Sequence, residues 1–266
     1  MLFGDHLVIV RGGGDLGTGV VYRLHRAGFP VVVLELAEPL TIRRTVAVSS
    51  AVADASITVE GMIARRVDSV ADARALARTG EVAVLVSPAL PPGADPAAVV
   101  DARLAKRNLD TTLEDAAFVV GLGPGFTAGT NCHAVVETAR GHRLGRVLHH
   151  GSAAPNTGRP GSLGGATAER VVRAPGDGVV QWDVAIGDLV EPGRQLGHIA
   201  GEPIVSGIGG VVRGLIAEGM TVPAGLKIAD IDPRGDPSAC FEISDKALAV
   251  GGGVLEAVLG HRNEQP

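Results

Sequence analysis

The sequence predicts an α/β fold with a mainly parallel sheet, followed by a small all-β domain built from two repeats. Three observations predict this class. In residues 1–150, short runs of Val and Leu alternate with helical patterns. Residues 155–171 are rich in Gly, Pro, Ser and Thr, which marks a linker. After the linker, a pattern of glycines and aliphatic residues recurs at an offset of 32 positions, as from Gly178 to Gly210.

The first half contains solid apolar runs, which are typical of strands buried on both faces of a parallel sheet. Segments between these runs are predicted to be helices, because they have helical periodicity and end at a glycine. One interruption reads as a hairpin that turns at Glu60 and Gly61. We expect strands at 6–10, 30–36, 82–87, 97–102 and 116–123, helices at 15–28 and 69–80, and the hairpin at 55–67.

The stretch "LVIVRGGGDLGTGVVYRL" combines a strand, a glycine turn and a helix. Gly12, Gly14 and Gly17 satisfy G-x-G-x-x-G, with Gly13 inside the turn, and Glu35 ends the next apolar run. Glycines let a phosphate approach the backbone at a helix N-terminus, and an acid at the position of Glu35 usually binds a ribose hydroxyl. We therefore expect a Rossmann-like domain that binds a nucleotide or phosphate-bearing ligand through these five residues.

Asp15 argues against this simple interpretation, because its negative charge would repel a pyrophosphate bound in the turn. It could instead cap the helix. A glycine turn that only shapes the backbone stays open as an alternative.

A second glycine segment, "GLGPGFTAGTNCHAVVETARGHRLGRV", begins at Gly121 after a buried strand. Loops at the carboxyl ends of strands commonly bind ligands, so Gly123 and Gly125 join the candidate cofactor-binding residues. His133 is a candidate general acid or base, with Glu137 on the same face, and Cys132 is a candidate nucleophile if its pKa is lowered. A satisfied polar network and an inert buried thiol are the alternatives. The spacing matches no metal motif, so no metal is predicted.

Basic side chains lie near several predicted strand ends and could bind the anionic tail of a cofactor. Ordinary solvated charge is the alternative. They are Arg43, Arg44, Arg103, Lys106 and Arg107.

The composition limits the classes of partner that the protein is expected to bind. A formal net charge of −5 and 3% aromatic residues give no support to nucleic-acid binding. Two cysteines without a CxxC pattern suit a reducing cytosol, and no apolar run approaches the ~20 residues that cross a bilayer. We expect a soluble cytoplasmic protein without membrane contact.

The repeat contains "VAIGDLVEPGRQL" at 184–196, which resembles the signature of the biotinyl/lipoyl-like barrel-sandwich family. That resemblance implies a barrel-sandwich hybrid domain. Carrier members attach biotin or lipoate to a lysine in the hairpin between the repeats. Here that hairpin reads "IAGEPIVS", without lysine, and Lys227 lies inside the second repeat. We therefore expect no covalent biotin or lipoate.

Three consecutive domains follow from these patterns. We expect a Rossmann-like α/β domain at 1–165, the barrel-sandwich at 166–237, and a helical tail at 238–266 that packs back on the first domain. Ser244 is a plausible N-cap for the tail helix, which contains three successive glycines at 251–253. Each glycine costs a helix about 1 kcal/mol relative to Ala, so the glycines break the helix or admit another backbone.

Ordered blocks along nearly the whole chain resemble YqeB-type proteins, accessory proteins of the selenium-dependent molybdenum hydroxylase system. The blocks are "VRGGGDLGTGVVYRLHRAGFPVVVLE", "RRTVAVSSAV", "VDARLAKRN", the segment from Gly121, "GSAAPNTG" and "KIADIDPRGD". The first half also resembles XdhC-type maturation factors. These resemblances imply a maturation role with a molybdopterin-type cofactor and a molybdenum hydroxylase client, and they imply no reaction or catalytic residue.

Two alternatives stay open. One is a nicotinamide-dependent oxidoreductase that uses the same turn, with Glu35 on the ribose and His133 as proton donor. The other is a scaffold without a ligand. In the accessory hypothesis, the barrel-sandwich contacts the client or a second copy of the chain as a homo-oligomer. Whether the chain is an enzyme is left undecided by its residues.

Overall fold

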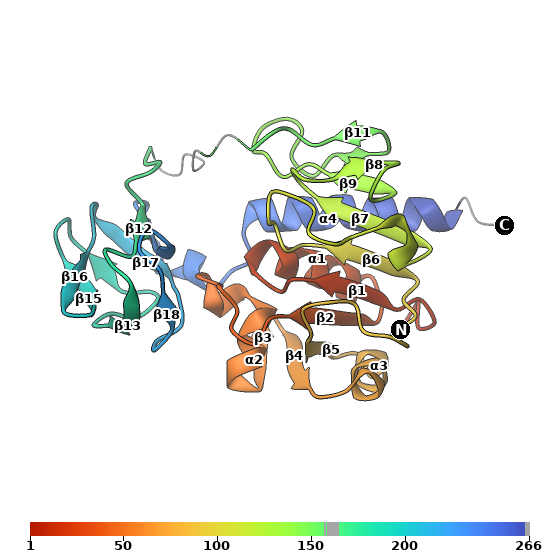
Figure 1. The fold of residues 1–266 in the computed structure, drawn as a ribbon, viewed down its shortest axis with the longest axis horizontal. Coiled ribbons are helices and arrows are strands. Elements are labelled where there is room, and N and C mark those ends of the chain that lie inside the picture. Colours follow the sequence, from red (N-terminus) through yellow and green to blue (C-terminus); the bar gives the residue numbers. More distant parts are fainter. Residues whose placement is uncertain (157, 159–164, 264–266) are drawn as a thin grey trace. The chain divides into compact units, whose positions relative to one another are not determined.

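The computed structural model describes residues 1–156, 158 and 165–263, and the chain forms two compact units (Figure 1). Unit 1 comprises residues 1–39 and 47–156 together with the chain from 243 onward. Unit 2 comprises residues 40–46 and the chain from 157 to 242. The units follow contacts rather than sequence order, since residues 40–46 belong to unit 2 but precede most of unit 1.

Unit 1 is built on a nine-stranded sheet with the order β10-β9-β7-β6-β1-β2-β5-β4-β3. β1 pairs in parallel with β2 and β6, so that Val8 lies opposite Val31 on one side and Ala98 on the other. The strands are β1 (Val8–Arg11), β2 (Val31–Glu35), β3 (Ser56–Val59), β4 (Met62–Val67), β5 (Val82–Val86), β6 (Ala98–Asp101), β7 (Phe118–Leu122), β9 (Ala134–Val136) and β10 (Val147–Leu148). A separate antiparallel pair is formed by β8 (Thr127–Ala128) and β11 (Gly151–Ser152).

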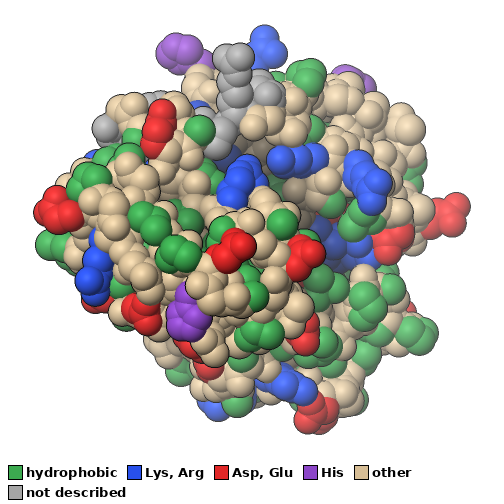
Figure 2. Space-filling model, turned by 60° about the vertical axis from the view of Figure 1, so that its left-hand side comes forward, with side chains coloured by type: hydrophobic (Ala, Val, Ile, Leu, Met, Phe, Trp, Pro, Cys, Tyr) green, Lys and Arg blue, Asp and Glu red, His purple; other side chains and the backbone are tan. Residues whose placement is uncertain are grey.

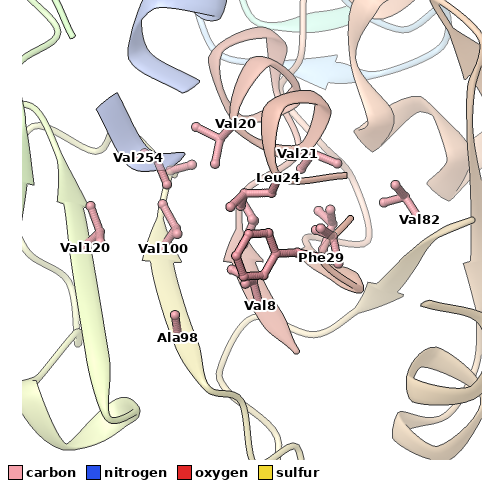
Figure 3. Packing of buried hydrophobic residues seen from close by; sticks show 14 of the residues in the cluster. Val8, Val20, Val21, Leu24, Phe29, Val82, Ala98, Val100, Val120 and Val254 are labelled. Carbon is pink, nitrogen blue, oxygen red and sulfur yellow. The ribbon is translucent and has the colours of Figure 1, made fainter. Parts of the chain in front are cut away.

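The central strands are buried on both faces because their side chains alternate between two apolar cores. Val8 and Val10 belong to one cluster with residues of helices α1 (Asp15–Arg26), α2 (Ala51–Asp54) and α4 (Asp245–Asn263). Figure 3 shows Leu24 of α1 next to Phe29 and Val8, and Val254 of α4 next to Val100. Leu7 and Ile9 belong to a second cluster with helix α3 (Val70–Arg78).

The glycines of α4 allow close packing between helices. A Cβ atom on Gly251 would lie closer than 3.0 Å to the carbonyl oxygen of Gly19 in α1, and one on Gly253 equally close to that of Gly145. A Cβ on Gly252 would meet nothing within 4 Å. The helix therefore continues through all three glycines, and two of them are required by backbones that pack against it.

The predicted fold class, a Rossmann-like domain with a mainly parallel sheet plus a barrel-sandwich hybrid, is wrong. The large sheet is mixed, because the hairpin β3–β4 lies at one edge and antiparallel β10 at the other. The connections 102–117 and 123–133, between β6, β7 and β9, contain no α-helix, and α4 from the end of the chain contacts β7, β9 and β10 instead. Short apolar runs look alike in parallel and mixed sheets, so sequence periodicity did not reveal strand direction.

Unit 2 contains two four-stranded antiparallel sheets with an apolar core that includes Val180, Leu196, Ile204, Val212 and Ile231. The orders are β12-β19-β17-β14 and β16-β15-β13-β18. The strands are β12 (Val171–Arg173), β13 (Gly178–Trp182), β14 (Leu189–Val190), β15 (Gln195–Ile199), β16 (Glu202–Val205), β17 (Gly210–Leu215), β18 (Thr221–Val222) and β19 (Lys227–Asp232). The two repeats interlock, since β13 pairs with β18 and β14 with β17.

The segment 40–46 is bound to the rest of unit 2 by backbone groups. The N–H of Leu215 donates to the carbonyl oxygen of Ile42 over 2.9 Å. A Cβ on Gly214 would lie 2.8 Å from the same oxygen. Short 3₁₀ turns occupy Arg44–Val46, Val48–Ser50, Leu113–Asp115 and Pro237–Cys240.

The surface carries charges of both signs. Figure 2 shows acidic and basic side chains spread over one face, with hydrophobic side chains between them. In the described part of the chain, no helix combines the length and apolarity that a membrane span needs.

Candidate functional site

The glycine turn joins β1 to α1 at the carboxyl edge of the sheet. Gly12 has a φ of +98°, which L side chains rarely adopt, and its N–H donates to the carbonyl oxygen of Leu34 over 2.8 Å. A Cβ on Gly12 would lie 3.0 Å from the Cα of Arg103. The turn therefore packs directly against the backbone that follows β6.

Two further glycines of the motif, Gly13 in the turn and Gly17 in α1, are also required by packing. A Cβ on Gly13 would lie 3.0 Å from the backbone nitrogen of Ser49 and from the side chain of Val33. A Cβ on Gly17 would lie closer than 3.0 Å to the carbonyl oxygen of Gly12. Internal packing therefore accounts for Gly12, Gly13 and Gly17.

Glu35 lies against the turn and is 9% exposed. Its Oε2 accepts the N–H of Gly13 over 2.7 Å, and its Oε1 accepts the N–H of Leu36 over 2.8 Å. The side chain predicted to bind a ribose hydroxyl thus binds two backbone amides of the protein. The carboxylate accepts hydrogen bonds from N–H groups that the tight turn would otherwise leave without an acceptor.

Gly14 differs from the other glycines of the turn. It is the N-cap of α1, with φ −64° and ψ −176°, a conformation open to any residue, and no side chain caps the helix. Among the described residues, its N–H has no hydrogen-bond acceptor. Asp15 is the first residue of the helix rather than its cap, and its Oδ1 accepts the N–H of Leu16 over 2.9 Å.

An ion cluster adjoins the turn at the ends of β1 and β6, with Arg11 and Asp101 buried and Asp110 at its exposed side; we call it the buried ion cluster after its two strand-end residues. Arg11 donates to Asp110 over 2.8 Å and to Thr111 over 3.0 Å. Asp101 accepts the Nε of Arg103 over 3.1 Å and the hydroxyl of Thr111 over 2.6 Å. Partial burial acts to raise the pKa of Asp110, but its hydrogen bonds to the guanidinium groups of Arg11 and Arg103 hold that pKa below its usual value.

Sequence reasoning named Arg103 as a residue that could bind an anionic ligand, but the structure pairs it with Asp101, and the rest of this cluster was missed. The signal was present in the charged residues that end two otherwise apolar strands, Arg11 in "VIVR" and Asp101 in "AVVD". A charge at the end of a doubly buried strand needs a partner.

The second glycine segment reaches the same edge, because β7 runs parallel to β6. Gly123 has a φ of +71°, and a Cβ there would collide with the hydroxyl of Thr138. Gly125 has a φ of +108°, and a Cβ there would lie 2.6 Å from the Cα of Arg107. Both glycine turns therefore contact the segment between residues 103 and 107.

His133 and Glu137 do not meet, because they flank opposite ends of β9. His133 lies at the amino end, where its Nδ1 accepts the N–H of Val119 over 3.0 Å. Glu137 lies at the carboxyl end and is 3% exposed. Its two oxygens accept the N–H groups of Ala139 and Ala154, each over 2.7 Å.

Cys132 is fully buried, and burial raises the pKa of its thiol to about 11. At neutral pH the side chain is therefore a thiol, which is a poor nucleophile. Burial also lowers the pKa of His133, with a smaller contribution from His261.

Lys246 is a basic residue of this edge that sequence reasoning did not single out. It lies in the first turn of α4, is partly buried, and interacts electrostatically with Asp15 and Glu137. Burial lowers the pKa of its amine, and Arg140 lowers it further. Arg140 itself pairs with Asp245 over 3.0 Å.

The other predicted basic residues divide between the units. In unit 2, Arg43 donates to the carbonyl oxygens of Ala239 and Glu242, and Arg44 donates to that of Leu215. In unit 1, Lys106 and Arg107 are exposed. In the described residues, no group of three or more His, Cys, Asp or Glu side chains is arranged to hold a metal ion.

Comparison with solved structures gives only weak likenesses. An aspartoacylase family protein from Mesorhizobium loti is 11% identical, covers 85% of this chain and 84% of that chain, and has a TM-score of 0.27. The ectoine utilization protein EutE (DoeB) from Ruegeria pomeroyi is 11% identical over 85% of this chain and 57% of that chain, with a TM-score of 0.24. Scores of this size support neither a shared fold nor a shared activity.

No protein-family model matches the chain. A relative from Escherichia coli (strain K12), "Uncharacterized protein YqeB", is 48% identical over 258 residues. The match covers 96% of this chain and 48% of the relative, so the chain spans about half the length of that protein. The likeness supports the resemblance to YqeB-type proteins, and the chain is similar to YqeB along nearly all of its own length.

Proposed function

We propose that the chain binds a phosphorylated ligand, a nucleotide or a molybdopterin-type cofactor, at the carboxyl edge of unit 1. The observation that carries the proposal is the N–H of Gly14, which points from the N-terminus of a 12-residue helix without an acceptor in the described chain. A helix N-terminus attracts negative charge through its free N–H groups and its dipole.

The amine of Lys246 supports the same proposal. The charge of this amine interacts with the carboxylates of Glu137 and of Asp15, the residue after Gly14. A phosphate bound at Gly14 would add negative charge near this amine. The attraction between the amine and the phosphate would offset the repulsion between the phosphate and Asp15. Ligand binding would therefore raise the pKa of Lys246.

We further propose that the protein acts in the cytoplasm as an accessory protein in the maturation of molybdenum hydroxylases. This part of the proposal depends on the resemblance to YqeB-type proteins, and the link to selenium-dependent enzymes depends on it too. The relative is about twice as long, so its other half contains residues that this chain does not match. Unit 2 would contact the hydroxylase client or a second copy of the chain.

The test is a calorimetric titration of the purified chain with molybdopterin dinucleotide and, separately, with NADH. Gly14→Val adds bulk beside the open N–H in a conformation that valine adopts, and Gly14→Ser is the small control that can cap the helix. The proposal expects binding by the wild type and Gly14→Ser, and loss of binding in Gly14→Val. Equal binding by all three proteins contradicts it.

NADH separates the proposal from the oxidoreductase alternative. Binding of NADH that is lost in Glu35→Ala would favour the oxidoreductase. Binding of the molybdopterin dinucleotide without binding of NADH would count against it.

A ligand-free scaffold is the second candidate, favoured by two observations. Gly12, Gly13 and Gly17 are all required by internal packing, and Glu35 already binds the amide of Gly13. In that case Gly14→Val changes the free energy of unfolding, and neither compound binds the wild type.

A further inference from the structure

The segment 103–111, which we call the edge loop, lies between β6 and β7 in the chain and contacts both glycine turns of unit 1. At its start, the Cα of Arg103 lies within 3.0 Å of the position that a Cβ on Gly12 would take. Near its middle, the backbone of Arg107 lies 2.6–2.7 Å from the position of a Cβ on Gly125. No larger residue fits at either glycine without displacing the loop.

The base of the edge loop is closed by the buried ion cluster. Asp101 binds Arg103 and Thr111, and Arg11 binds Asp110 and Thr111, so side chains join the two ends of the loop. The side chain of Asn108 adds a bond to the carbonyl oxygen of Thr111 over 2.7 Å. If the loop moved away, the buried Arg11 and Asp101 would be left without partners, which is costly, so these bonds hold the two ends of the loop in place.

The loop is held in a conformation that its sequence disfavours. Leu104 and Lys106 have φ values of +55° and +63°, although neither is glycine. Each such residue costs of the order of 1 kcal/mol, and it persists only where the surroundings impose it.

The middle of the loop carries two cations. Lys106 and Arg107 are exposed, and neither makes a side-chain hydrogen bond or ion pair with any described residue. The acidic residues of the neighbouring cluster are already engaged, Asp101 with Arg103, and Asp110 and Asp115 with Arg11. The two cations are therefore free to meet an external anion.

We propose that Lys106 and Arg107 form an anion-binding site for the phosphate groups of a pyrophosphate ester. This inference deepens the proposed function and rests on it, because it assigns phosphate groups of the ligand to the edge loop, whose backbone contacts the glycine turn at Gly12. A guanidinium group binds two phosphate oxygens at once, and an ammonium group supplies a compact charge. The ligand class is a molecule with two adjacent phosphates rather than a monophosphate.

The experiment titrates the full chain with inorganic pyrophosphate, followed by calorimetry at low ionic strength. The test variant is Lys106→Gln with Arg107→Gln. The matched control is Arg26→Gln with Arg78→Gln, which removes two exposed charges from the last turns of α1 and α3. Thermal unfolding of each variant verifies that the fold is kept.

We expect the test variant to bind pyrophosphate about tenfold more weakly or worse, since a charge-assisted hydrogen bond contributes roughly a factor of ten. The control should stay within about twofold, because exposed charges at a distance are screened by salt. Unchanged binding by a folded test variant overturns the inference, and so does a wild type that binds no pyrophosphate.

Gly14→Val, measured in the same titration, separates this inference from the proposed function. Binding that is lost in Gly14→Val but kept in the loop variant contradicts the loop site and leaves the proposed function standing. Binding that is lost in the loop variant but kept in Gly14→Val supports the loop site and contradicts the role of Gly14.

Discussion

The N–H of Gly13 donates to Oε2 of Glu35 over 2.7 Å, which ties the glycine turn to the carboxyl end of β2. The other oxygen, Oε1, accepts the N–H of Leu36. A carboxylate with both oxygens engaged by amides is a structural anion. It occupies the N–H of Gly13, whereas the N–H of Gly14 has no acceptor among the described residues.

The first prediction concerns this carboxylate. Glu35→Gln replaces one acceptor oxygen by an amide group that cannot accept a hydrogen bond, so either the N–H of Gly13 or that of Leu36 loses its partner. The free energy of unfolding should fall by about 1–3 kcal/mol. Urea denaturation followed by circular dichroism measures the change. Glu38→Gln, at an exposed site nearby, is the control and should change the free energy by less than about 0.5 kcal/mol. Equal effects of the two variants would refute the structural role of Glu35.

The second prediction compares three neighbouring glycines of α4. Gly251→Ala and Gly253→Ala place a methyl group against the carbonyl oxygens of Gly19 and Gly145, so each should lose about 1–3 kcal/mol of unfolding free energy. Gly252→Ala meets nothing within 4 Å and should gain up to about 1 kcal/mol from helix propensity. Thermal unfolding of the three variants ranks them, and a stabilised Gly251→Ala would contradict the close packing of α1 and α4.

The third prediction concerns the cysteines. Cys132 is buried with a pKa raised to about 11, and burial also raises the pKa of Cys240. Neither thiol should react with a thiol-specific reagent at pH 8 in the native protein, and both should react in denaturant. Rapid labelling of Cys132 in the native state is the contrary result, and it would restore this residue as a candidate nucleophile.

The fourth prediction concerns acid stability in unit 2. Burial acts to raise the pKa of Asp232, but its hydrogen bonds and charge interaction with Arg234 hold that pKa below its usual value. A lowered pKa in the folded state stabilises the protein above the unfolded pKa, and this stability is lost as the pH falls through the folded pKa. The contribution of Asp232 to the free energy of unfolding should therefore be present at neutral pH and fall as the pH drops below the pKa of an unfolded Asp, about 4.

Arg234→Gln removes the main partner of Asp232. Its deficit relative to the wild type should be largest near pH 7 and should shrink as the pH falls, because protonated Asp232 no longer needs the guanidinium group. Denaturation at a series of pH values gives this difference. Arg194→Gln, at an exposed arginine of the same unit, serves as the matched control and should show no such dependence. A deficit that is constant with pH would show that Arg234 acts through packing alone.

The elements that local patterns specify were predictable. The run "HLVIV" covers all of β1 except Arg11, the amphipathic segment after the turn contains α1, and Ser69 begins α3 by accepting the N–H of Asp72 over 3.1 Å. These features depend on the periodicity and capping of neighbouring residues. The hairpin at Glu60 and Gly61 was likewise marked by its turn residues, and both have positive φ.

Features that depend on distant residues were not predictable. Strand direction at the sheet edges is set by which segments meet in space, so the fold class was assigned wrongly. Arg11 meets Asp110 across 99 positions, and Ile42 meets Leu215 between segments that no local pattern connects. At the candidate site, the motif indicated which glycines lie together, but only the structure shows that Gly14 is the N-cap of α1 and that its N–H has no acceptor among the described residues.

The account depends most on a phosphorylated ligand at the carboxyl edge of unit 1, and native mass spectrometry of the chain purified from its own host tests this most directly. The account predicts that the wild type carries an added mass that contains phosphorus and that Gly14→Val has the mass of the bare chain. A wild type with the mass of the bare chain, or an added mass that Gly14→Val retains in full, would contradict it.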